Sequence, residues 1–338
     1  LFKIYNKIMA TYLARLRSPF FIDHTTSVTS GSADITITIN SVDQYVISKD
    51  TVSNRATFEV SELIRDFLTP TWDGLFPYSS TTTDSLTVTA SIQVEFYTNN
   101  KKTRAANTAA GNPDTPIGAE TQSHTIYGFD AYSEFKEGAN HQLSSGQMLQ
   151  SATTMYLPET GDAYIPIESS NAVSYYTVAD TVTDGTVINP VVGIDVTIRR
   201  ICEPIFDIIK VVFMNKFGAL QEFHFNKKNT VNFSTTQENY ESMLIQANTY
   251  NTNKHQKYVY NKQGSETILL NTGYIDLAQY ETMKQLMLSE QVWAVISGTT
   301  YPVNVKTNTL TKKTKINDKL VNYSLEMEFA YDVVNSVR

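Results

Sequence analysis

The residues that could do chemistry in this chain are few and widely spaced. The 338 residues include one cysteine and five histidines, which do not fall into the Cys/His spacings that bind zinc. No phosphate-binding glycine loop, dinucleotide-binding glycine pattern, zinc-protease helix motif or nucleophile elbow occurs along the chain. We therefore predict no cofactor, no metal site and no catalytic residue, and we predict that the protein is not an enzyme.

Two individual residues could have a reactive role instead of a structural one. Cys202 follows Arg199 and Arg200, and neighbouring cations could favour its thiolate. No histidine stands close to it in the sequence, so we interpret Cys202 as a buried structural residue. His224 lies between two phenylalanines in a strand-like run. We interpret it as a side chain on the solvated face of a strand rather than as a catalytic base.

Acidic pairs could act as the acid and the base of a glycosidase. The candidate pairs are Glu134 with Glu137, Asp162 with Glu168, and Glu326 with Glu328. Glu326 and Glu328 would share one face of a strand, where they are too close to flank a glycosidic bond. We interpret these carboxylates as solvated surface groups, and a cell-wall glycosidase stays open as an alternative function.

Aromatic residues in polar segments could stack on sugars. The residues concerned are Trp72, Tyr78, Tyr175 and Tyr176. Such side chains more often pack into a core or an interface. They define a second alternative function, a receptor- or carbohydrate-binding adaptor whose site would be an exposed aromatic groove around Trp72 and Tyr175.

One segment, residues 306–319, concentrates positive charge on a chain that is acidic overall. Its lysines are Lys306, Lys312, Lys313, Lys315 and Lys319. One interpretation is an edge hairpin whose lysines prevent stray strand pairing. The other interpretation is docking onto an acidic neighbouring copy. On the second interpretation we predict that these lysines lie at a subunit interface.

Composition narrows the class of protein. The net charge of −7 and the pI of about 5.3 argue against a general nucleic-acid binder, which needs a basic surface. The single cysteine excludes an intramolecular disulfide, and no apolar run approaches the length of a membrane span. Threonine makes up roughly one residue in eight. Threonine is β-branched and suits half-buried sheet surfaces, so this composition favours a β-rich protein.

Three segments alternate between apolar and polar residues, which is the period of a strand with one packed and one solvated face. They are residues 35–40, 86–96 and 321–329. Residues 205–214 are nearly all apolar and predict a strand buried on both faces. We therefore predict a mainly β protein, built from antiparallel β-sandwich or barrel domains with one flanking helix each.

The clearest helix prediction covers residues 276–289. Asp276 can cap its first turn. Tyr280, Met283 and Met287 share one face of such a helix, and we expect that face to pack on a sheet.

A second, shorter helix is predicted over residues 61–68, with Ser61 as its N-cap. The polar segment 98–123 contains several glycines and prolines. It predicts a long loop or an ordered arm.

The predicted organisation has three parts. Residues 1–8 form an N-terminal extension, because Met9-Ala10 resembles a natural start. Residues 9–200 form an N-terminal β domain that includes the 98–123 loop. The pattern of a buried strand begins after Arg200, so residues 201–338 form a C-terminal β domain that includes the 276–289 helix.

Several segments resemble uncharacterised virion structural proteins of phages that infect Bacteroidetes. The segments are 12–22 (YLARLRSPFFI), 58–67 (FEVSELIRDF), 213–223 (FMNKFGALQEF), 271–274 (NTGY), 292–293 (VW) and 301–305 (YPVNV). The resemblance spans most of the chain. It implies a non-enzymatic component of a tailed-phage virion, found in the virion after assembly in the host bacterial cytoplasm.

The C-terminal part also resembles ring-forming tail-tube and distal-tail proteins, with a sandwich or barrel, one flanking helix, a hairpin and a long last strand. Residues 9–200 exceed what a bare tube subunit needs, which favours a baseplate, distal-tail or neck role. The resemblance implies self-association into a ring, expected to be a hexamer, and contacts with other virion structural proteins. We expect no specific nucleic acid and no membrane as partners. The adaptor and glycosidase alternatives stay open.

Overall fold

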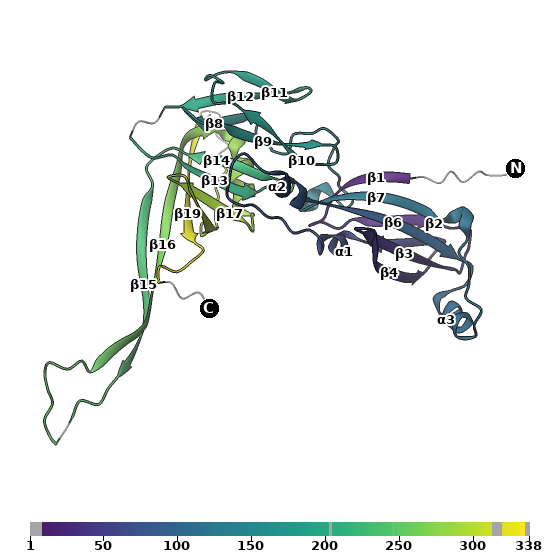
Figure 1. Ribbon diagram of the computed structural model, residues 1–338, viewed down its shortest axis with the longest axis horizontal. Coiled ribbons are helices and arrows are strands. Elements are labelled where there is room, and N and C mark those ends of the chain that lie inside the picture. The colour runs from purple at the N-terminus through teal and green to yellow at the C-terminus, as the bar shows by residue number, and fades with distance from the viewer. Residues whose placement is uncertain (1–8, 203–204, 246, 313–319, 335–338) are drawn as a thin grey trace.

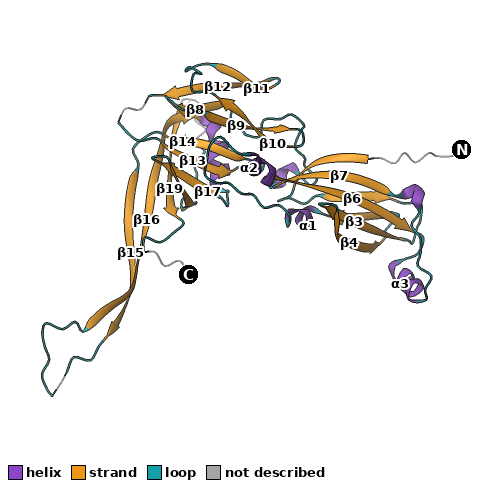
Figure 2. Cartoon of the chain, in the orientation of Figure 1, coloured by secondary structure: helices purple, strands orange, loops and turns teal. Residues whose placement is uncertain are grey.

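The computed structural model describes residues 9–202, 205–245, 247–312 and 320–334, which form two lobes and a projecting β-ribbon (Figure 1). The chain is mainly β, as predicted, with 49% of it in strands and 12% in helices. Figure 2 shows that the strands run through both lobes and the ribbon, whereas the helices are short. The fold is therefore set by strand pairing and by the packing of sheet faces.

The N-terminal lobe is built on a five-stranded sheet. Its strand order is β1 (Met9–Arg15), β7 (Gln122–Phe129), β6 (Thr87–Tyr97), β3 (Ser32–Ile39) and β4 (Val42–Asp50). Strands β1 and β7 are parallel, and the other neighbours are antiparallel. A second sheet of two antiparallel strands, β2 (Phe21–Thr25) and β5 (Arg55–Glu59), supplies the other half of the core.

The alternating residues of β3 and β6 form the centre of this core. Ile35 pairs with Val94 and Ile37 with Ile92, and all four side chains are at most 1% exposed. Phe58 of β5 joins the same cluster. The period-two pattern therefore places one face of the large sheet against the small sheet, as expected for a sandwich.

Short helices connect these strands. They are α1 (Ser61–Arg65), α2 (Ser80–Ser85), α3 (Lys101–Ala109) and the 3₁₀ turn η1 (Gly118–Glu120). Helix α1 lies where the 61–68 helix was predicted but is shorter. The prediction that Ser61 is its N-cap is wrong, because Val60 holds the cap position and the Ser61 hydroxyl donates to the Glu59 carboxylate.

Helix α3 lies inside the segment 98–123, where the sequence analysis predicts a loop or arm. Asn100 caps it by accepting a hydrogen bond from the backbone N–H of Thr103 at 2.9 Å. The Arg104 guanidinium binds the Asp34 carboxylate at 2.6 and 2.8 Å. No residue of α3 is buried. Since the helix has no apolar stripe, periodicity could not reveal it, and a cap and an ion pair hold it in place.

A small layer of sheets lies over the C-terminal lobe. Its three-stranded sheet has the order β11 (Val187–Val191), β12 (Ile194–Ile201) and β8 (Thr154–Pro158), with β8 and β12 parallel. A two-stranded sheet pairs β9 (Ala163–Ser169) with β10 (Ala172–Val178). Buried Leu157, Ile165 and Ile198 join the two sheets in one cluster.

The C-terminal lobe is built on a seven-stranded antiparallel sheet. Its order is β14 (Leu220–Phe225), β13 (Ile209–Met214), β17 (Val292–Ile296), β18 (Thr299–Val305), β19 (Leu320–Phe329), β16 (Lys257–Asp276) and β15 (Thr230–Glu241). Val321, Tyr323, Leu325 and Met327 of β19 are all at most 5% exposed. The alternation predicted for the last strand is confirmed.

The predicted 276–289 helix is present as the 3₁₀ turn η3 (Leu277–Gln279) followed by α4 (Tyr280–Met287). Asp276 caps it, since its carboxylate accepts a hydrogen bond from the backbone N–H of Ala278 at 3.1 Å. Met283 and Leu286 are fully buried against the sheet, whereas Met287 is only half-buried. The helix therefore packs on the sheet as predicted, but Leu286 rather than Met287 is the fully buried residue near its end.

Strand β13 begins at Ile209, within the apolar run 205–214, and is buried on both faces as predicted. Val211 packs in the core of the C-terminal lobe, and Val212 packs in a second cluster. That second cluster also contains Leu13 and Phe129 of the N-terminal lobe. The predicted domain boundary after residue 200 falls just before the last residue of β12, and this shared cluster combines residues from both sides of it.

Ion pairs also join the lobes, near the 3₁₀ turn η2 (Phe135–Glu137) and α4. Glu290 lies 2.5 Å from the Arg17 guanidinium and 3.7 Å from that of Arg65. Lys284 of α4 binds the Glu134 carboxylate at 2.6 Å. The two lobes are thus connected by a shared apolar cluster and by charged contacts beside it.

Candidate assembly site

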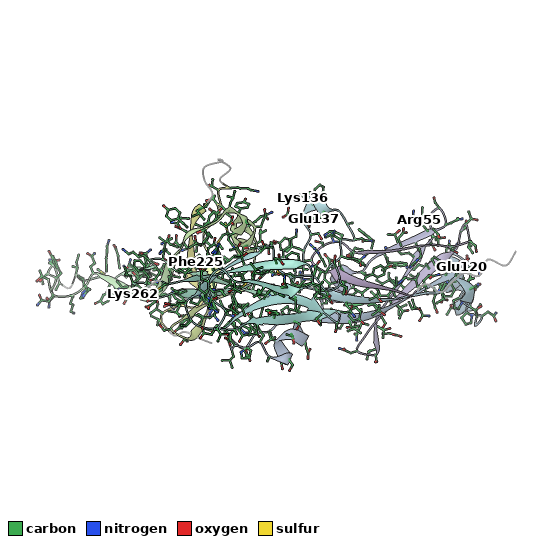
Figure 3. All side chains as sticks on the ribbon, turned by 90° about the horizontal axis from the view of Figure 1, so that it is seen from above. Arg55, Glu120, Lys136, Glu137, Phe225 and Lys262 are labelled. Atoms are coloured by element: carbon green, nitrogen blue, oxygen red, sulfur yellow. The ribbon has the colours of Figure 1, made fainter. Side chains whose placement is uncertain are left out.

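The most exposed element is the β-ribbon that projects from the C-terminal lobe, which we call the arm (Figure 1). It consists of β15, residues 257–266 of β16 and the loop that joins them. Strand β15 pairs with β16 over nearly its whole length, whereas β19 pairs with β16 only from Thr267 onward. The outer part of the arm is therefore a two-stranded ribbon. Seen from above, Lys262 on the arm lies at the opposite end of the molecule from Arg55 and Glu120 (Figure 3).

Cross-strand pairs of side chains hold the arm in its ribbon form. The rings of Tyr240 and Tyr258 stack with centroids 5.3 Å apart, and the hydroxyls of Ser234 and Ser265 lie 2.8 Å apart. The register shifts beside Asn261, which has a φ of 47°. Such a bulge increases the twist of a ribbon, and asparagine tolerates this left-handed conformation.

Every residue of β15 is exposed, and the arm carries many apolar and aromatic side chains that no other part of the described chain covers. Those that are at least 36% exposed are Val231, Phe233, Tyr240, Met243, Ile245, Tyr250, Tyr258, Val259 and Tyr260. A two-stranded ribbon is marginally stable by itself in water. A concentration of exposed apolar side chains of this kind is typical of a protein–protein contact.

The outer edge of β15 strengthens this interpretation. In the described chain β15 is the last strand of its sheet, so one edge of its backbone has no strand partner. Its twelve residues contain no lysine and no proline, the residues that commonly protect sheet edges from pairing. The arm therefore offers both apolar side chains and an unprotected strand edge, and we treat it as the candidate assembly site.

The lysine segment predicted as a subunit interface is only partly described. Lys306 lies 3.6 Å from the Glu328 carboxylate of β19. The Lys312 ammonium lies 5.2 Å from the centre of the Tyr280 ring. Lys313, Lys315 and Lys319 lie outside the described residues. The interface role of this segment stays a prediction.

The buried polar cluster that sequence reasoning missed lies on β13 and β14. Lys210 lies 3.7 Å from the Glu222 carboxylate, whose two oxygens are buried without a hydrogen-bond partner of normal geometry among the described residues. Burial raises the pKa of Glu222 to about 7, although Lys210 opposes this effect. The neighbouring Tyr78 hydroxyl is also buried, and burial raises its pKa.

This cluster adjoins a cavity of about 20 Å³, which Glu222, His224, Gln150 and Gln279 help to line. That volume has room for one water molecule and lies far below the roughly 300 Å³ of a small-molecule site. We therefore interpret Glu222 and Lys210 as a buried structural ion pair. The prediction that His224 faces solvent is wrong: it is 6% exposed, and burial lowers its pKa to about 3.

Two histidines that the sequence analysis did not connect lie side by side in the N-terminal lobe. The Nε2 atoms of His24 and His124 are 2.6 Å apart, and the rings are stacked. Burial lowers the pKa of both, to about 4 for His124. Both rings are therefore neutral at pH 7, with one donating to the other, and they join β2 to β7.

The acidic pairs that could have formed a glycosidase site are engaged in structural contacts. Hydrogen bonds from Lys136 and Lys284 lower the pKa of Glu134 to about 2, opposite to what a general acid requires. Glu134 and Glu137 form the capping box of η2. Lys136 and Glu137 lie together at the side of the molecule in Figure 3. Glu168 is 3% exposed and accepts a hydrogen bond from the backbone N–H of Asn171 at 2.7 Å, so its interpretation as a solvated surface group is wrong.

Trp72 and Tyr175, which define the adaptor alternative, pack in the shared cluster. The Trp72 ring lies 5.2 Å from that of Trp293, and Tyr175 stacks on Tyr78 at 4.0 Å. These contacts do not leave the exposed aromatic groove that an adaptor site at Trp72 and Tyr175 would need. Cys202 is exposed, so the prediction of a buried structural cysteine is wrong.

Within the described ranges, no group of three or more His, Cys, Asp or Glu side chains is placed to hold a metal ion. None of the described helices has the length and apolarity needed to cross a membrane. Comparison with protein-family models, curated proteins and solved structures found no match to this chain.

Proposed function

We propose that this chain is a non-enzymatic structural component of a tailed-phage virion, a ring-forming tail, baseplate or neck protein that assembles with copies of itself and with other virion proteins. The observation that carries the proposal is the arm, a long ribbon with exposed aromatic side chains and an unprotected strand edge. Such a ribbon becomes stable when a neighbouring subunit covers it. A closed ring covers every such edge, because each copy contacts the next. A hexamer is the expected ring.

The virion assignment is supported by the resemblance of residues 12–22, 58–67 and 213–223 to phage virion proteins. Those segments occupy β1 and its following turn, β5 with α1, and β13 with β14. They belong to the body of the two lobes rather than to the arm. The resemblance of the two lobes thus supports the assignment to a virion protein. The exposed arm supports self-assembly.

The lysine segment 306–319 supplies a secondary contact in this proposal. Ion pairs at the rim of an interface contribute about 0–1 kcal/mol each. Apolar side chains and backbone hydrogen bonds must therefore provide most of the stability of assembly, and the arm has both.

A shortened arm tests the proposal. Thr236 pairs with Gln263, so residues 237–262 can be replaced by Asn-Gly, which closes a two-residue hairpin. We expect the full chain to form a closed oligomer by native mass spectrometry and rings by electron microscopy. We expect the shortened chain to be monomeric. Its far-ultraviolet circular dichroism spectrum should show that the two lobes keep their fold.

A milder pair of variants controls for damage to the ribbon. Phe233→Ser with Tyr240→Ser keeps the backbone of the arm and should weaken assembly. Phe135→Ser removes an even more exposed aromatic side chain outside the arm, and it should leave assembly unchanged. A full-length chain that stays monomeric at high concentration, or a shortened chain that still forms the same oligomer, would contradict the proposal.

A further inference from the structure

A groove at the base of the arm has the chemistry to receive the arm of another copy. It occupies about 320 Å³ where the start of β15, the β17–β18 turn and the end of β19 meet. Its apolar walls include Val231, Ile296, Tyr301 and Phe329, and its acidic residues are Asp207 and Glu266. We call this feature the groove.

The walls of the groove are aromatic and partly exposed. The rings of Tyr301 and Phe329 meet edge to face at 5.8 Å, and Tyr331 lies 5.6 Å from Phe329. Tyr331 is 44% exposed and Val231 is 54% exposed. Aromatic pockets of this size accept a few inserted side chains, and such anchors supply most of the affinity in protein interfaces.

The far end of the arm has the complementary properties. Met243, Ile245 and Tyr250 are 61–86% exposed there, and we call these three the tip side chains. Lys254 is exposed beside them and forms no ion pair with any described residue. The groove has two acids, Asp207 and Glu266, and neither is ion-paired in the described part of the chain. Opposite charges of this kind set the register and orientation of a contact.

The tip cannot reach the groove of its own chain. Val231 lines the groove, and Glu241 lies ten residues along the same strand. At about 3.3 Å per residue, that separation is about 33 Å, and the arm points away from the lobe over this distance (Figure 1). The tip and the groove are therefore different surfaces that can meet only between two copies.

We propose that the arm of one copy inserts Met243, Ile245 and Tyr250 into the groove of the next copy, with Lys254 facing Asp207 and Glu266. This inference rests on the self-assembly proposed above and specifies its contact. Because the two surfaces differ, the contact is head-to-tail, and it generates a ring when the rotation between copies closes. A symmetric arm-to-arm dimer, in which two β15 edges pair, is the competing geometry.

Two full-length variants test the contact. The tip variant carries Tyr250→Ser with Lys254→Glu, and the groove variant carries Asp207→Lys with Glu266→Lys. Alone, each should weaken assembly by about tenfold or more in dissociation constant, measured by analytical ultracentrifugation. The control Lys102→Glu on α3 makes the same charge change as Lys254→Glu, and the control Glu159→Lys after β8 makes the same change as each of the two groove substitutions; both positions are exposed, and both controls should assemble like the wild type.

Mixing the variants distinguishes the geometries. The tip variant keeps an intact groove, the groove variant keeps an intact tip, and the reversed charges of the two variants also attract each other, so a head-to-tail contact predicts that mixing restores an association that neither variant shows alone. An arm-to-arm contact predicts that the groove variant assembles alone and that mixing adds nothing, and this result would overturn the inference. If both variants assemble normally while the shortened arm does not, the inference fails and the proposed function stands. A wild-type chain that is always monomeric overturns both.

A cross-link keeps the test valid if a variant folds poorly. In a Cys202→Ser background, chains with Tyr250→Cys are mixed with chains with Ser297→Cys, at the rim of the groove. A short bis-maleimide should join the two kinds of chain at a yield well above that of a control pair with Lys102→Cys in place of Tyr250→Cys. Equal yields for the two pairs would contradict the contact.

Discussion

Glu222 illustrates how one buried residue can couple the stability of this protein to pH. It lies on β14 with its carboxylate fully buried, close to Lys210 and the Tyr78 hydroxyl. Strand β14 is covered on both faces, so every residue of it is buried. A strand in that position cannot expose its polar residues, and the ion pair reduces the cost of burying them without removing it.

We predict that Glu222→Gln changes the pH dependence of unfolding. Burial raises the pKa of Glu222 from 4.5 to about 7, so the unfolded chain releases this proton first as the pH rises. The wild-type free energy of unfolding therefore falls between pH 4.5 and pH 7, by about 3 kcal/mol from this residue. The free energy of unfolding of the variant minus that of the wild type should therefore increase by that amount between pH 4.5 and pH 7. Urea titrations at several pH values measure this difference. A constant difference across the range would show that Glu222 is not responsible.

Helix α4 illustrates how an amphipathic element is held by its sheet. The predicted face packs as expected, but its fully buried positions are Met283 and Leu286. Lys284, on the opposite side, binds Glu134 of the N-terminal lobe at 2.6 Å. The helix thus contributes to the core of one lobe and to the contact with the other.

We predict that Met283→Ala lowers the free energy of unfolding by about 2–5 kcal/mol, because it leaves a cavity at a fully buried site. Met287→Ala should cost less than that range, since Met287 is half-buried and solvent can occupy the space. Equilibrium denaturation of both variants measures the two costs. Equal costs would contradict the depth of packing assigned to the two residues.

At the scale of the whole molecule, the shared cluster makes the two lobes one cooperative unit. Leu13 and Phe129 of the first half pack with Val212 and Leu220 of the second half. The ion pairs of Glu290 lie at the edge of this contact, and that side chain is 64% exposed. Apolar contact therefore decides how firmly the lobes are joined, because an exposed ion pair contributes about 0–1 kcal/mol.

We predict that Leu220→Ala lowers the stability of both lobes together, by about 2–5 kcal/mol. Hydrogen exchange measured by mass spectrometry should show that the amides of β3 and β19 lose protection in the same step. Glu290→Gln serves as the control and should change the free energy of unfolding by less than about 1 kcal/mol. Independent loss of protection in β3 and β19 would contradict a shared core.

The arm was outside the reach of sequence reasoning for a physical reason. Residues 230–241 lack strict alternation and contain no long apolar run, so no face stands out as a core face. The strand is defined by its pairing with β16, which is 20 residues long and continues past the edge of β19. Only the mismatch in strand lengths reveals that the outer part of this pair has nothing packed on it.

Local sequence patterns determined the strands whose residues alternate between buried and exposed, and the helix that has one buried face. The segments 35–40, 86–96 and 321–329 became strands with one packed face, and 276–289 became a capped helix on a sheet, because period and capping are properties of consecutive residues. Tertiary structure alone decided what lies on each face. It buried His224 and Glu222 between two layers, and it left β15 with no layer at all. Burial depends on residues that are distant in the sequence, so no period within a strand can reveal it.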